Sequence, residues 1–104
     1  MSEIKRTFGD DGPDNADRAE WAAHVLSVFC KQTGLDPELE KREAVSDLIA
    51  NLGHYCDSHN IDFLRIASEA IGVWDAEKRE EENGEPNALY PEKKVLITLF
   101  ERPN

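Results

Sequence analysis

The sequence is poor in cysteine and in basic residues, and both shortages exclude classes of protein. Two cysteines among 104 residues cannot supply the disulfide framework of a small secreted domain. The 12 Lys and Arg are outnumbered by 22 Asp and Glu, and the net charge of -10 disfavours nucleic-acid binding by phosphate neutralisation. A charged fraction of 33% argues against membrane spans, and the first residues lack the apolar segment of a signal peptide. We therefore expect a cytoplasmic protein that binds neither membranes nor nucleic acid directly.

The chain does contain enough apolar material for a folded core. Apolar residues make up 39% of the sequence, which is too much for a disordered acidic tail. At this length we expect a single domain over residues 1–104. Its predicted organisation is a helical core over 16–83, a linker over 84–94 and a short strand over 95–100.

Apolar side chains recur at helical spacing in three segments, which predicts a mainly α, three-helix fold. The first helix is expected over residues 16–33, with Asp14 or Asn15 as its N-cap and Gly34 as its stop. At about 100° per residue, one stripe of this helix consists of Trp21, Val25, Val28 and Phe29.

Two further helices have clear boundary signals. Asp36 followed by proline is typical of a helix start, and this second helix is expected to end near residues 58–60. Asp62 caps a third helix that runs to about residue 84. The short connection predicts a central antiparallel hairpin. We expect the hairpin to bury two facing apolar sets, namely Val45, Leu48, Ile49, Leu52 and Cys56 against Leu64, Ala67, Ile71 and Trp74.

The carboxyl-terminal segment fits two secondary structures, a strand or a short helix. Val95–Phe100 is apolar and partly β-branched, so we favour a strand that pairs with Ile4–Phe8 as a short β addition. Pro91, followed by three charged residues, would equally suit the start of a short helix. A run of six residues is too short for periodicity to decide.

One group of side chains has the composition of a metal site. His54, Cys56, Asp57 and His59 fall within six residues. However, Cys56 lies with the apolar stripe of the second helix, whereas His54 lies on the opposite side. We therefore interpret the group as a buried thiol and a solvated imidazole.

Three carboxylates, Glu40, Glu43 and Asp47, line one face of the second helix. Facing carboxylates in a helical bundle can hold Mg²⁺, as in the all-helical nucleoside triphosphate pyrophosphohydrolases, which place E-x-x-E on one helix and E-x-x-D on the next. Residues 40–43 supply the first half of this pattern, but the third helix supplies no E-x-x-D. We interpret the face as a solvated acidic surface and keep the Mg²⁺-dependent enzyme as an alternative. We assign no catalytic residue, metal or cofactor.

Charge is the strongest remaining signal, because a net charge of -10 on a small domain attracts basic surfaces. We predict a non-catalytic interaction or regulatory module that binds another protein. A second alternative is an inhibitor that imitates the phosphate array of a duplex and so occupies a DNA-binding or host-defence protein. The predicted interface is the polar face of the second helix with one apolar anchor from the first: Glu40, Glu43, Asp47, His54 and Trp21. Two small residues one turn apart, Ala19 and Ala23, also allow a homodimer through the first helix.

The middle of the chain carries a recognisable pattern. Asp47–Asp57 reads D-L-I-A-N-L-G-H-Y-C-D and is followed by I-D-F at 61–63. This segment, within residues 44–77, resembles small uncharacterised acidic helical bacterial proteins of plasmids, phages and integrated elements. The resemblance implies a helical hairpin and brings no established activity with it. Its mobile-element setting favours a host-interaction or defence-inhibitor role.

Overall fold

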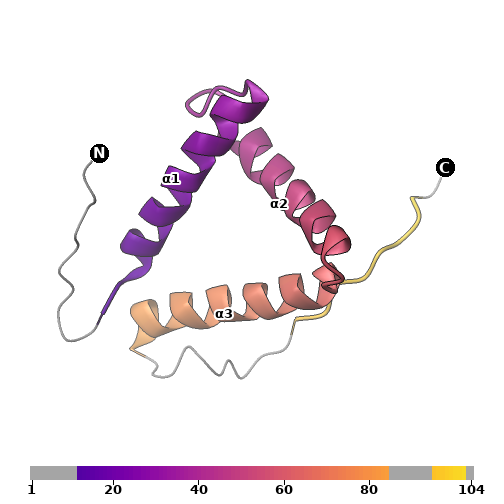
Figure 1. Ribbon diagram of the computed structural model, residues 1–104. Helices are drawn as coiled ribbons and strands as arrows, with labels where there is room; N and C mark the ends of the chain where they lie inside the picture. Colours follow the sequence, from indigo (N-terminus) through magenta and orange to yellow (C-terminus); the bar gives the residue numbers. More distant parts are fainter. Residues whose placement is uncertain (1–11, 85–94, 103–104) are drawn as a thin grey trace. The chain divides into compact units, whose positions relative to one another are not determined.

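The computed structural model describes residues 12–84 and 95–102, and the regular secondary structure within them is helical (Figure 1). The helices are α1 (Asn15–Thr33), α2 (Lys41–Ser58) and α3 (Phe63–Asn83). The predicted mainly α, three-helix class is confirmed. Residues 95–102 have neither helix nor strand, so the strand expected over 95–100 is wrong. Its expected pairing partner, Ile4–Phe8, lies outside the described residues, as does Pro91.

The chain divides into two compact units, and the boundary falls inside α2. The first unit is Met1–Ala44 and the second is Val45–Asn104. The first therefore holds α1 and the opening turn of α2, and the second holds the rest of α2 together with α3. The single domain expected from the sequence stays a prediction.

Helix α1 begins one residue before the predicted start and ends at the predicted residue. Asp14 and Asp17 form a capping box, in which the Asp17 N–H donates to Asp14 Oδ1 at 2.9 Å and the Asp14 N–H donates to Asp17 Oδ2 at 3.0 Å. Gly34 ends the helix in the left-handed conformation, with φ 82°, and its N–H donates to the Cys30 carbonyl at 2.8 Å.

Helix α2 starts later than the sequence predicts. The expected start at Asp36 is wrong, because Asp36 caps a separate single turn before the helix. Asp36 Oδ1 accepts the N–H groups of Glu38 and Leu39, at 2.8 and 3.3 Å. Glu40 closes this turn with its own N–H, which donates to the Asp36 carbonyl at 2.8 Å. The regular helix then begins at Lys41.

The connection from α2 to α3 is a tight turn. Asn60 has φ 58°, the left-handed conformation that asparagine tolerates. Asp62 caps α3 as predicted, accepting the Arg65 N–H at 3.3 Å. At the other end, Gly84 takes φ 72° and its N–H donates to the Glu80 carbonyl at 2.8 Å.

The buried core of the described residues is small. In the first unit it consists of Phe29, Cys30 and Ala44, and in the second of Cys56, Gly72 and Ala76. Burial of the Cys56 thiol agrees with the sequence analysis.

The core expected between α2 and α3 is wrong for its largest members. Leu52 is 47% exposed, Ile71 is 40% exposed and Trp74 is 59% exposed. The two helices meet beside their connection, where Cys56 is buried and Phe63 reaches Gly53. Apolar side chains farther along each helix therefore keep much of their surface in water.

Candidate functional site

The polar face predicted for the second helix exists on α2. Glu43, Asp47 and His54 are all exposed, and at 100° per residue they fall within an arc of about 40°. The structure therefore brings these three side chains into one row, with two carboxylates followed by an imidazole. A row of this kind offers hydrogen-bond acceptors and negative charge to a partner surface.

Glu40, the fourth predicted member of this face, has a local role. It precedes α2, is partly buried, and its Oε1 accepts the Asp36 N–H at 2.8 Å. Because the side chain folds back on the preceding turn, Glu40 stabilises the entry to α2 as well as adding charge beside it.

Trp21, the predicted apolar anchor, lies on α1 in the first unit. Its side chain is exposed, as an anchor for a partner must be. Trp21 therefore stays a candidate contact residue on an element of its own.

A second surface consists of apolar side chains in the second unit, and sequence reasoning assigned all of them except Tyr55 to the core. We call these residues the apolar stripes. They are all at least 40% exposed, with Val45, Ile49, Leu52 and Tyr55 on α2 and Leu64, Ile71 and Trp74 on α3. The same spacing of three and four residues serves a buried core and a docking surface equally well, so the sequence carries no signal that separates the two.

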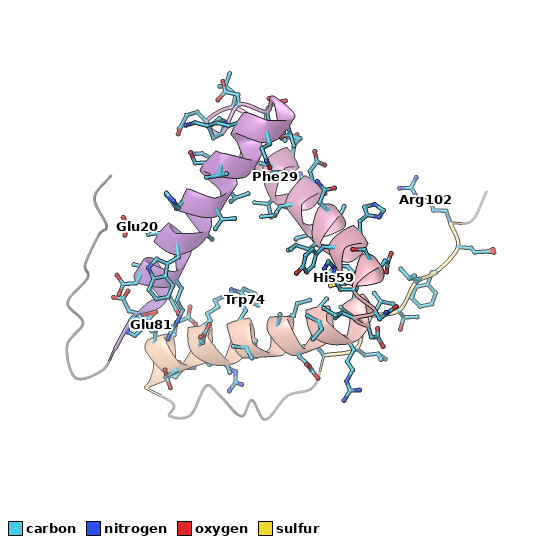
Figure 2. The ribbon with its side chains drawn as sticks, viewed as in Figure 1. Glu20, Phe29, His59, Trp74, Glu81 and Arg102 are labelled. Carbon is cyan, nitrogen blue, oxygen red and sulfur yellow. The ribbon has the colours of Figure 1, made fainter. Side chains whose placement is uncertain are left out.

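Trp74 is the largest exposed side chain of the apolar stripes, and it already holds a cation. The Lys78 ammonium lies 5.6 Å from the centre of the indole ring, within the range of a cation–π interaction (Figure 2 labels Trp74). Beside it, Arg79 Nε lies 3.1 Å from Asp75 Oδ2 in a partly buried ion pair. The face of the Trp74 ring therefore attracts a positively charged group.

His59 closes the carboxyl-terminal end of α2 (Figure 2). Its ring stacks on Tyr55, with centroids 4.1 Å apart, and its Nδ1 lies 2.9 Å from the Tyr55 carbonyl. A carbonyl only accepts, so Nδ1 carries the proton and donates. Ser58 Oγ donates to the same carbonyl at 2.9 Å. His59 thereby caps the carboxyl-terminal end of α2.

The described part of the chain gathers no three His, Cys, Asp or Glu side chains that could hold a metal ion. Cys56 is buried while His54 is exposed, as their positions on the helix predict. Within residues 12–84 and 95–102, no helix combines the length and apolarity needed to cross a membrane.

Comparison with known proteins adds no relative. No protein-family model matches the chain, and no curated protein or solved structure matches it. The resemblance in residues 44–77 therefore stays a prediction.

Proposed function

We propose that this protein is a non-catalytic module that binds another protein. The observation that carries the proposal is the exposure of the apolar stripes, which place seven large side chains on α2 and α3 in water. Exposed apolar patches of this kind mark interaction surfaces, because a partner that covers them removes apolar surface from water, which is favourable.

The acidic row of α2 supplies the second element of the proposal. Glu43 and Asp47 give a partner with a basic surface a favourable approach and speed its association. Our proposal places the protein in the cytoplasm, in a regulatory or host-interaction role of the mobile-element type.

The same row favours a second candidate function, imitation of a nucleic acid. Exposed carboxylates on a chain with a net charge of -10 repel DNA and compete with it for a basic groove. In that case DNA would displace the protein from its partner, and binding would weaken steeply with salt.

Affinity capture in the native host, followed by mass spectrometry, tests the proposal. The wild-type chain is compared with an apolar-stripe variant, Ile49→Ser with Leu52→Ser, and a polar-face variant, Glu43→Gln with Asp47→Asn and His54→Ala. The matched control removes two carboxylates elsewhere, by Glu69→Gln and Glu101→Gln.

We expect a partner that the wild type and the control retain and that the apolar-stripe variant loses. The polar-face variant should retain it less well, most clearly at low salt. A capture pattern that is the same for all four chains would reject a specific interaction surface on α2. Hydrolysis of nucleotides by the wild type, with Mg²⁺ binding that Glu43→Gln removes, would reject the non-catalytic role.

A further inference from the structure

Building on the proposed function, we propose that one face of α3 is the docking site for a basic amphipathic helix of another protein. This partner helix has apolar anchors in one half and Lys or Arg in the other. Three observations support it: the order of residue types along one face of α3, the balance of charge in the second unit, and the cation already on Trp74.

The face changes character along the helix. At 100° per residue, Leu64, Ile71 and Trp74 lie in one sector about 100° wide, and Glu81 and Glu82 lie in the same sector two turns beyond. At 1.5 Å per residue, the apolar part spans about 15 Å and the acidic part ends about 12 Å farther on. A helix laid along this face would meet apolar side chains first and carboxylates next.

The balance of charge selects a basic partner over a second copy of the chain. Between residues 45 and 84, nine carboxylates stand against three basic side chains, Arg65, Lys78 and Arg79. Arg79 already pairs with Asp75. Two copies would bring like charges together, whereas a partner rich in Lys and Arg would neutralise them.

Trp74 supplies the anchor at the junction of the two parts. Trp74 is 59% exposed, and the Lys78 ammonium already lies over its ring, so the indole face attracts a cation. A Lys or Arg of the partner can take this place while its apolar neighbours cover Ile71 and Leu64. Tryptophan at such a position is typical of the residues that dominate binding energy.

The probe that tests this proposal is a synthetic amphipathic helix of about 18 residues, long enough to cover the face. It has Leu at spacings of three and four in one half and Lys in the other. Its control keeps every Leu and replaces each Lys by Glu. Both peptides are titrated into the full-length protein by calorimetry and by ¹H–¹⁵N NMR, in which the two tryptophans give separate indole signals.

We expect the Lys peptide to bind and to shift the Trp74 indole signal but not that of Trp21. Trp74→Ala should weaken binding at least ~10-fold. Ile66→Ala is the matched control for Ile71→Ala, because Ile66 is also exposed on α3 but lies about 110° round the helix from the centre of the face. Ile71→Ala should weaken binding and Ile66→Ala should not.

Charge is tested separately by Glu81→Gln with Glu82→Gln, which leaves the apolar part intact. This variant should weaken binding of the Lys peptide ~5-fold at low salt and by little in ~1 M salt. Equal binding of the Lys and Glu peptides, or a chain that sediments as a dimer through this face, would overturn the proposal.

Failure of this inference differs from failure of the proposed function. If neither peptide binds but affinity capture still finds a partner that needs the apolar stripes, the docking chemistry proposed here is wrong and the interaction role stands.

Discussion

Phe63 packs its ring against the backbone of Gly53, so that a methyl group added to Gly53 would lie 3.2 Å from Phe63 Cδ2. Gly53 sits inside α2, where glycine is a poor helix former, and Phe63 opens α3. The close approach gives a reason for glycine at this position, because it lets the first residue of one helix rest on the helix before it.

A double-mutant cycle on Gly53 and Phe63 measures this contact. Gly53→Ala alone gains helix propensity, up to ~1 kcal/mol, but must displace the Phe63 ring. In the background of Phe63→Ala the ring is gone, and we expect the full gain. Urea unfolding of the four chains gives the coupling. Equal effects of Gly53→Ala in both backgrounds would mean that the ring moves aside freely.

The exposure of Ile71 predicts a small cost of truncation. Ile71→Ala should lower the free energy of unfolding by about 1 kcal/mol or less, since much of the side chain is already in water. Phe29, which is buried, should cost about 3–5 kcal/mol when changed to Ala. Chemical denaturation compares the two. A cost above about 2 kcal/mol at Ile71 would show that its side chain is covered in solution.

The turn before α2 should depend on the Asp36 carboxylate. Asp36→Ala removes the acceptor for two backbone N–H groups and should cost about 1 kcal/mol, while Asp36→Asn, which can still accept, should cost less. Hydrogen exchange at the Glu38 amide reports the turn directly. Unchanged exchange in Asp36→Ala would contradict the proposed cap.

The amino end of α1 should loosen in acid. The Asp17 N–H that donates to Asp14 lowers the pKa of Asp14 below its ordinary value of 3.8. A lowered pKa in the folded state means that the cap stabilises α1 fully above the ordinary value, and that this contribution is lost as the pH falls through the lowered one. NMR titration of the Asp14 carboxyl gives the midpoint.

Asp14→Asn is the control for this titration, because it keeps an acceptor and removes the charge. Exchange of the Asp17 amide should then no longer respond to acid through this site. A midpoint at 3.8 or above in the wild type would show that the capping box gives the carboxylate no preference for its charged form.

The sequence was sufficient for most helix ends and insufficient for burial. Asp14, Gly34, Asp62 and Gly84 act through bonds within a few residues, so their roles follow from local chemistry. The predicted start of α2 was wrong because an aspartate before proline caps a single turn as readily as a long helix. The sequence pattern also does not show that the Glu40 side chain folds back to accept the Asp36 N–H.

The prediction of which side chains are buried failed for a different reason. An apolar stripe on a helix indicates which side chains tend to avoid water, but it does not indicate which surface covers them. Cys56, beside the turn, is buried as expected, whereas Leu52, one turn earlier, is not. The row of Glu43, Asp47 and His54 could be predicted because solvated positions need no partner, and the apolar stripes could not.

Each compact unit carries one buried thiol, Cys30 in the first and Cys56 in the second. Since the sequence has no other cysteine, alkylation by a thiol reagent reads the opening of each unit at its own site. Mass analysis of peptides gives the alkylation rates of Cys30 and Cys56 separately. One experiment therefore shows whether the two units open together or independently. An occupant that covers only the second unit would slow the modification of Cys56 and leave that of Cys30 at its original pace.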